Sequence, residues 1–104
     1  MDGDVLTPFL EPRGVVIIGI SRAALESPVS ILTTLKDFGY RGEVYVVNPH
    51  LRSEDDANIR FRPTLGEVPA RLDLAVVSVE RGQVPGVLRD CVAKEILAAI
   101  VITQ

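Results

Sequence analysis

An apolar run that stops on a glycine and a hydroxyl residue constrains this chain most. Residues 14–22 have the sequence Gly-Val-Val-Ile-Ile-Gly-Ile-Ser-Arg, and Ser27-Pro28 then precede a helical pattern. The run of β-branched residues predicts a buried strand, and Pro28 suits the first position of a helix. A strand, a turn of small residues and a helix start place backbone N–H groups where an anion can bind. The pattern therefore favours a nucleotide-like ligand.

The length and composition favour one α/β domain. The chain has 104 residues, of which 47% are hydrophobic and 5% aromatic, so Val, Ile, Leu and Ala must build the core. Such a core suits parallel strands between helices. We expect residues 1–104 to form a single domain, with residues 1–12 as an N-terminal extension. Because residue 104 directly follows a predicted strand, we also expect the native protein to continue, or another chain to cover that edge.

Charge and cysteine content exclude several classes of protein. The net charge is −3 and Lys and Arg are scattered, which argues against nucleic-acid binding. Cys91 is the sole cysteine and His50 the sole histidine, which excludes a disulfide framework and a Cys/His zinc site within one chain. The acidic run Glu54-Asp55-Asp56 has the character of a solvated loop rather than a metal site. No signal peptide and no apolar stretch of about 20 residues is present, which predicts a cytoplasmic protein without a membrane segment.

Alternating signals of strand and helix define the expected topology. Strands are predicted at residues 15–19, 43–47, 74–79 and 96–103, with a brief edge strand at 59–62. Helices are predicted at 29–38, where Leu32 and Leu35 share one side, and at 84–94. Thr64 and Glu67 have the spacing of a capping box, in a helix that Pro69 limits to about one turn.

Right-handed crossovers then favour a Rossmann-like, doubly wound parallel sheet of about five strands in the order 3-2-1-4-5. The switch point of that sheet lies between the first strand and the strand at 74–79. Ligands of such sheets bind outside the carboxyl ends of the strands. The candidate site is therefore formed by the residues at the carboxyl ends of the first, second, fourth and last strands.

The order of short motifs along the chain resembles a known family. The motifs are Pro-Arg-Gly-Val-Val-Ile-Ile-Gly-Ile-Ser-Arg at 12–22, Gly-Tyr-Arg-Gly-Glu-Val-Tyr-Val-Val-Asn-Pro at 39–49, Pro-Thr-Leu-Gly-Glu-Val-Pro at 63–69, Leu-Asp-Leu-Ala-Val-Val-Ser-Val at 72–79 and Ala-Ala-Ile-Val-Ile-Thr at 98–103. Together they resemble the N-terminal CoA-binding domain of NDP-forming acyl-CoA synthetases, which are related to the α subunit of succinyl-CoA synthetase. No single motif is specific, but their joint order is.

The resemblance implies a domain that binds the nucleotide part of CoA or acyl-CoA and has no catalytic residue of its own. Arg22 is suited to hold the diphosphate, because a guanidinium binds phosphate oxygens bidentately. The resemblance also implies that other domains or subunits of a ligase, or further copies of the chain, are its partners. The candidate contact residues, carried over by position or chosen for their chemistry, are Gly19, Ile20, Ser21, Arg22, Asn48, Pro49, His50, Val79, Pro85 and Thr103.

Departures from the family pattern keep a second hypothesis open. Residues 23–29 lack the glycines that the family usually has before its first helix, and Glu26 adds a negative charge there. His50 replaces a common lysine, and Glu80 follows Val79 where the family commonly has a proline. These features favour a domain that has lost its ligand and serves regulation or assembly, pairing through its edge at 96–103.

An NAD(H)-binding domain is the third hypothesis. A dinucleotide site normally has Asp or Glu at the end of the second strand, and this chain has Asn48 there.

Two residues with reactive side chains, Ser21 and Cys91, are not expected to be catalytic. Ser21 lacks the base that would activate a nucleophile, and Cys91 is expected to be a small buried hydrophobe.

Overall fold

The computed structural model describes residues 13–20, 31–37, 40, 42–49, 59–69 and 71–102, and the fold is defined by these parts of the chain. Five strands form one sheet, in which every neighbouring pair is parallel. Their order is β3-β2-β1-β4-β5, which confirms the predicted topology and its switch point between β1 and β4. The strands are β1 (Val15–Ile18), β2 (Val44–Val47), β3 (Ile59–Arg62), β4 (Leu74–Val77) and β5 (Ala98–Val101).

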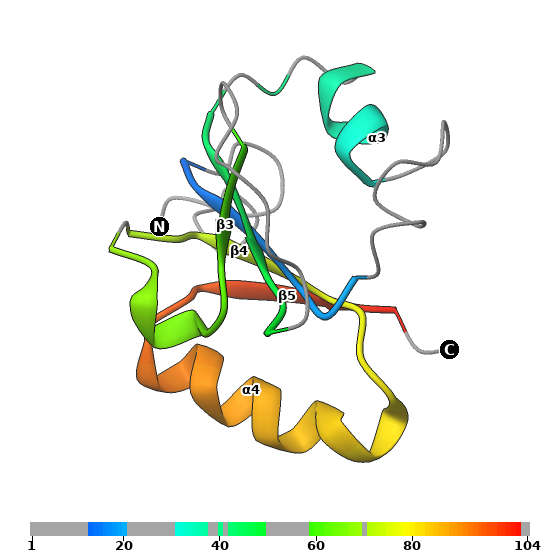
Figure 1. The fold of residues 1–104 in the computed structure, drawn as a ribbon, viewed down its shortest axis with the longest axis vertical. Helices are drawn as coiled ribbons and strands as arrows, with labels where there is room; N and C mark the ends of the chain where they lie inside the picture. Colours follow the sequence, from blue (N-terminus) through cyan, green and yellow to red (C-terminus); the bar gives the residue numbers. More distant parts are fainter. Residues whose placement is uncertain are drawn as a thin grey trace, which may run out of the picture.

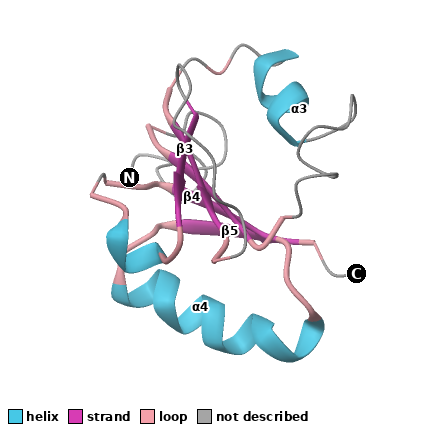
Figure 2. Cartoon of the chain, viewed as in Figure 1, coloured by secondary structure: helices cyan, strands magenta, loops and turns pink. Residues whose placement is uncertain are grey.

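Helices lie on both faces of the sheet (Figures 1 and 2). The helix α3 (Ile31–Asp37) lies on one face. On the other face lies α4 (Val84–Ala93), which the short 3₁₀ helix η2 (Arg81–Gln83) precedes. A second 3₁₀ turn, η1 (Leu65–Glu67), packs on the same face as α4 through Leu65. The described helices include none that is long and apolar enough to cross a membrane.

Alternation along the strands divides the core into two layers. Val15 and Ile17 point to the α3 face, where Leu35 packs against them, and Val16 and Ile18 point to the α4 face. The side chains of Val15, Val16 and Ile17 are fully buried, as a central parallel strand requires. Burying one such side chain stabilises the fold by roughly 1.5–3 kcal/mol. The continuous apolar run of β1 is therefore explained by burial on both faces.

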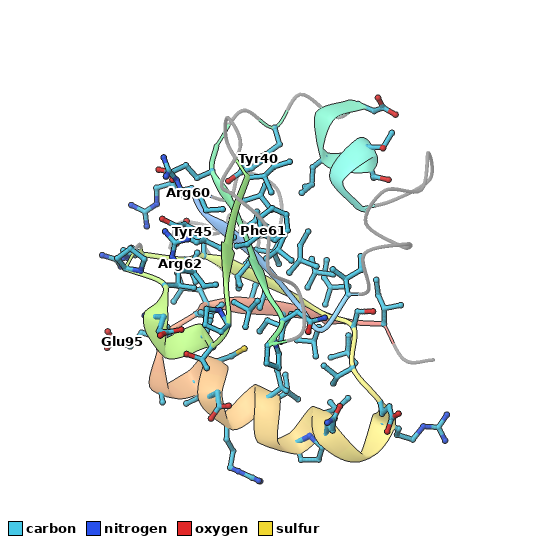
Figure 3. All side chains as sticks on the ribbon, viewed as in Figure 1. Tyr40, Tyr45, Arg60, Phe61, Arg62 and Glu95 are labelled. Carbon is cyan, nitrogen blue, oxygen red and sulfur yellow. The ribbon has the colours of Figure 1, made fainter. Side chains whose placement is uncertain are left out.

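The edge strand β3 shows the alternation of a half-buried strand (Figure 3). Phe61 packs into the α3 layer, whereas Arg60 and Arg62 lie on the other side. The Nε of Arg60 donates to Glu43 at 2.7 Å, and the guanidinium of Arg62 lies 5.8 Å from the centre of the Tyr45 ring. Charged side chains on an edge strand oppose pairing with other chains. The brief edge strand predicted at 59–62 is thus confirmed with its bounds.

The other elements match their predictions except at their ends. The strands predicted at 15–19, 43–47, 74–79 and 96–103 and the helix predicted at 84–94 are each shorter, by one to four residues, than expected. Residues 29, 30 and 38 of the other predicted helix lie outside the described residues. The capping box expected at Thr64 and Glu67 is wrong. The Thr64 hydroxyl donates to the Glu67 carboxylate at 3.3 Å, and it makes no capping hydrogen bond to the backbone. A single 3₁₀ turn leaves little room for the reciprocal pattern of a full helix start.

Candidate functional site

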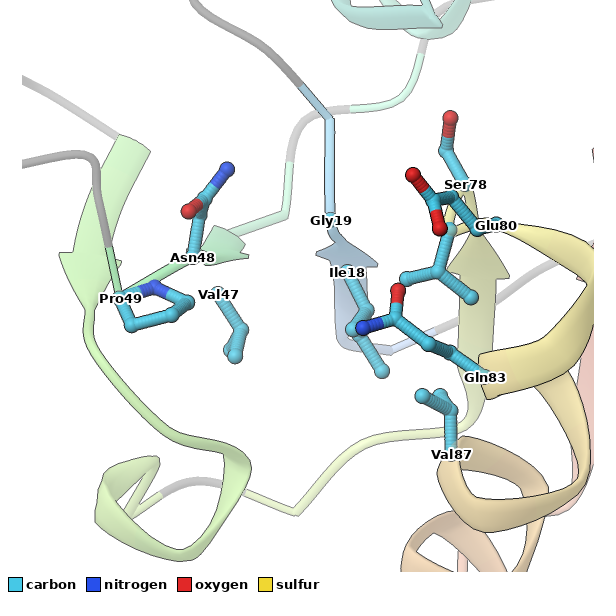
Figure 4. Close-up of a pocket in the computed structure, with 10 residues that line it drawn as sticks. Ile18, Gly19, Val47, Asn48, Pro49, Ser78, Glu80, Gln83 and Val87 are labelled. Carbon is cyan, nitrogen blue, oxygen red and sulfur yellow. The ribbon is translucent and has the colours of Figure 1, made fainter. Parts of the chain in front are cut away.

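A pocket of about 440 Å³ opens at the carboxyl ends of β1, β2 and β4, at the switch point of the sheet. Figure 4 shows Asn48 and Pro49 on one side, Gln83 and Val87 on the other, and Ile18 between them. We call the first side the β2 wall and the second the β4 wall. The residues that line the pocket are Ile18, Gly19, Val47, Asn48, Pro49, Ser78, Val79, Glu80, Gln83 and Val87.

Gly19 forms the base of this pocket where the chain leaves β1. Its φ of +88° belongs to the left-handed region, which glycine adopts without strain. A Cβ built on Gly19 would lie 2.6 Å from the carbonyl oxygen of Ser78 and 2.4 Å from Cγ1 of Val79. The chain therefore needs a glycine here for two reasons, its backbone conformation and its close packing against the end of β4.

Backbone hydrogen bonds hold the three strand ends together. The N–H of Gly19 donates to the carbonyl of Val47 at 2.9 Å, and the N–H of Ser78 donates to the carbonyl of Ile18 at 2.8 Å. Ser78 is itself buried, with an exposed fraction of 8%. These bonds continue the sheet ladder one step beyond the strands, so the base of the pocket is built on rigid backbone.

Asn48 links the β2 wall to the chain that follows β1. Its Nδ2 donates to the carbonyl of Ile20 at 2.9 Å, and its backbone N–H donates to the carbonyl of Arg62 at 3.2 Å. The side-chain amide thus fixes the position of Ile20, which is buried in the α3 layer. An amide that donates to a carbonyl differs from the carboxylate that accepts ribose hydroxyls in dinucleotide sites. This geometry gives the end of β2 a positioning role.

The β4 wall carries the polar side chains Glu80 and Gln83. Glu80 has extended backbone, with φ −61° and ψ 148°, and directly precedes η2. The backbone N–H of Gln83 donates to the carbonyl of Glu80 at 2.9 Å, which fixes their relative position. Val79 and Val87 line the same wall and belong to the α4 layer of the core. The wall therefore combines apolar side chains with a carboxylate and an amide.

The predicted site residues divide into three groups. Gly19, Asn48, Pro49 and Val79 line the pocket. Ile20 and Pro85 do not line it, because Ile20 is 7% exposed within the core and Pro85 occupies the first turn of α4 with its side chain exposed. The rest lie outside the described residues: Ser21, Arg22, His50 and Thr103.

The candidate contact residues predicted from the sequence lack six of the lining residues: Ile18, Val47, Ser78, Glu80, Gln83 and Val87. Gln83 and Val87 are four residues apart at the start of α4, so their spacing on one helix face was the available signal. That signal did not indicate which strand end the face would meet. Glu80 was expected at the end of the fourth strand and noted as a departure from a family pattern, but it was not chosen as a contact residue; in the structure it lines the pocket.

Other reactive side chains stand apart from the pocket. Cys91 is 3% exposed in the α4 layer, as expected for a small buried hydrophobe. Burial raises the pKa of the Cys91 thiol, and the charge of Asp90 acts in the same direction. A raised pKa leaves the thiol protonated and unreactive. Within the described parts of the chain, His, Cys, Asp and Glu side chains form no group of three or more that could hold a metal ion.

A Rossmann-like fold with a pocket at its switch point is typical of nucleotide-binding domains, and comparison with known proteins identifies the family. The model of a family described as "CoA binding domain" matches residues 13–104. An ADP-forming acetate–CoA ligase II of Archaeoglobus fulgidus is 29% identical over 99 residues, which cover 95% of this chain and 14% of the relative. An ADP-forming acetate–CoA ligase of Methanocaldococcus jannaschii is 34% identical over 92 residues, covering 88% of this chain and 12% of the relative.

A solved structure agrees with the sequence relatives. It is a dinucleotide forming acetyl-coenzyme A synthetase 1 of Ca. Korarchaeum cryptofilum in complex with phosphate and ADP, with a TM-score of 0.74 and 30% identity. The match covers 95% of this chain and 21% of the solved chain. The chain therefore belongs to the CoA-binding domain family. Its Rossmann-like fold matches that of the corresponding segment in the solved acetyl-coenzyme A synthetase. In these relatives the matching segment is a small part of a larger ligase or ligase subunit.

Proposed function

We propose that this chain binds the nucleotide part of CoA or acyl-CoA at the carboxyl edge of its sheet, as the ligand-binding part of an acid–CoA ligase. The observation that carries the proposal is the pocket at the switch point between β1 and β4, in a chain of the CoA-binding domain family. Open parallel sheets bind their ligands at this place.

The form of the pocket supports a part of CoA as its ligand. A volume of about 440 Å³ lies within the range of small-molecule sites. Apolar side chains from Ile18, Val47 and Val87 provide the contact area, and a few polar groups at the rim provide orientation. The diphosphate would lie beside the turn after β1, where we propose that Ser21 and Arg22 contact it.

The chemistry of ligation belongs, on this proposal, to parts of the ligase outside this segment. The relatives that share this segment are several times longer than it is. The role of the domain would be to hold CoA by its nucleotide so that the thiol or thioester reaches a second domain or subunit.

Titration calorimetry with CoA, acetyl-CoA, ADP and NADH tests the proposal. We expect heat from CoA and acetyl-CoA and a matching rise in melting temperature, because a ligand that binds only the folded state stabilises it. Tighter binding of NADH would favour the dehydrogenase-type hypothesis. No binding of any nucleotide would favour a domain that has lost its ligand.

Arg22→Ala is the variant that tests the phosphate contact. Loss of a charge-assisted bond to phosphate should weaken CoA binding by about tenfold and reduce its salt dependence. Arg89→Ala is the matched control, because Arg89 is exposed on α4 and does not line the pocket. Equal affinity of Arg22→Ala and wild type would remove Arg22 from the site.

A further inference from the structure

The lining of the pocket has an unusual charge for a site that takes a phosphorylated ligand. Among the described lining residues one is ionisable, and it is the carboxylate of Glu80. The other polar lining side chains are the neutral groups of Asn48, Ser78 and Gln83. A phosphate placed at this wall would meet a like charge, which disfavours it.

Residues around the end of β1 pack on both faces of the sheet. The apolar lining of the pocket, from Ile18, Val47, Val79 and Val87, belongs to the core layer beneath α4. Ile20 precedes the turn and packs instead in the layer beneath α3. The apolar lining of the pocket and the side chain of Ile20 therefore belong to opposite layers of the core.

We propose that Glu80 is a specificity-determining residue that accepts a hydrogen bond from an uncharged N–H or O–H donor of the ligand. This inference rests on the proposed function and assigns a part of the nucleotide ligand to the pocket. CoA carries its negative charge on phosphates and its uncharged donors on the adenine amine, the ribose hydroxyl and the pantetheine chain. A carboxylate only accepts hydrogen bonds, so it selects among these groups.

Gln83 and the apolar lining of the pocket also favour an uncharged portion of the ligand. The carboxamide of Gln83 points from the β4 wall toward the space in front of Ile18 (Figure 4). An amide can donate to or accept from a neutral polar group. Pro49 on the β2 wall and Val87 on the β4 wall provide apolar surface for an uncharged ligand portion. The pocket therefore matches a neutral, donor-bearing portion better than an anionic one.

The direction in which Glu80→Gln changes the affinity for CoA tests the inference. Glu80→Gln removes the charge and keeps the shape, and it should weaken the binding of both CoA and dephospho-CoA by about three- to tenfold. Because a neutral donor is involved, the loss should be similar at low and high salt, about 50 and 300 mM. Glu95→Gln changes the net charge equally at the opposite end of α4, away from the pocket, and should leave both affinities unchanged (Figure 3).

Three outcomes would overturn the inference. Tighter binding by Glu80→Gln would mean that the carboxylate repels a nearby phosphate, and Glu80→Lys would then tighten binding further. Unchanged binding of the ligands by Glu80→Gln and by Glu80→Lys would show that Glu80 contacts no part of the ligand. Absence of binding by wild type together with binding by Glu80→Gln would overturn the inference, because the carboxylate would then exclude the ligand, and it would favour a domain that has lost its ligand. If neither protein bound either ligand while both melted cooperatively, the proposed function itself would fail.

Discussion

Gly19 is the residue at which the chain leaves β1, and its backbone packs against the end of β4 too closely for a side chain. The distances of 2.4 and 2.6 Å from a built Cβ to Val79 and Ser78 lie far inside van der Waals contact. One of the two neighbours is the backbone carbonyl of Ser78, and the N–H of the same residue donates to the carbonyl of Ile18. A shift of the Ser78 backbone away from an added Cβ would therefore strain that hydrogen bond. This position therefore couples the shape of the pocket to the stability of the sheet.

Gly19→Ala should lower the free energy of unfolding by about 2–4 kcal/mol, through left-handed strain and overpacking. Urea denaturation followed by circular dichroism measures the change. Gly82→Ala is the control, because a Cβ there meets nothing within 4 Å, and its stability should stay near that of wild type. Equal stability of Gly19→Ala and wild type would contradict the close approach of β1 and β4.

At the scale of elements, the end of α4 shows how a helix stops without the usual glycine. The N–H of Ile96 donates to the carbonyl of Cys91 and the N–H of Glu95 donates to that of Val92, both at 3.0 Å. Ile96 and Cys91 also share the α4 layer of the core. These bonds and this contact form a Schellman motif, in which Glu95 has a φ of +61°. The motif uses residues that the predicted strand at 96–103 would have included, so β5 starts later.

Glu95→Gly should raise the free energy of unfolding by about 0.5–1 kcal/mol, because glycine adopts the left-handed conformation without strain. The measurement is the shift of the thermal and urea midpoints. Glu95→Ala provides the comparison, since it removes the same carboxylate and keeps the strain. If both variants changed stability equally, the effect would come from charge and not from the backbone.

At the scale of the molecule, one ion pair joins the start of the sheet to its fourth strand. The backbone N–H and the Nε of Arg13 both donate to Oδ2 of Asp73 at 3.0 Å, and Nη2 donates to Oδ1 at 3.4 Å. Asp73 is 4% exposed. The hydrogen bond from the Arg13 side chain lowers the pKa of Asp73 below its ordinary 3.8, although burial opposes this shift. The pair exists only in the folded chain, so it links proton binding to folding.

A carboxyl group whose pKa is lower in the folded state stabilises the fold above its unfolded pKa. We expect Asp73→Asn to reduce the free energy of unfolding by about 1–2 kcal/mol at neutral pH. The difference from wild type should shrink as the pH falls below about 4 and through the lowered pKa, because the wild-type carboxylate is then protonated. Urea unfolding of both proteins at several pH values measures this difference in the free energy of unfolding.

Asp90→Asn is the control for this pH series, since Asp90 is exposed on α4. Its difference from wild type should stay small across the whole range. A deficit of Asp73→Asn that persisted unchanged at low pH would show that the loss comes from packing and not from the charge of Asp73.

The sequence by itself determined the strands, their order and the turn at Gly19. Runs such as Val15–Ile18 have no stable alternative to burial on both faces, and right-handed crossovers then leave few ways to order the strands. The site residues Gly19 and Asn48 followed from this, because strand ends can be located from local patterns.

Tertiary structure alone decided which residues face Asn48 across the pocket and how the strand and helix ends are finished. Glu80, Gln83 and Val87 reach the pocket only because β4 pairs with β1 in a register that aligns their carboxyl ends. The Schellman end of α4 and the bonds of Arg13 with Asp73 likewise depend on packing between segments. Local periodicity assigns each residue to a face of its own element, but the meeting of distant faces is set by sheet register and core packing.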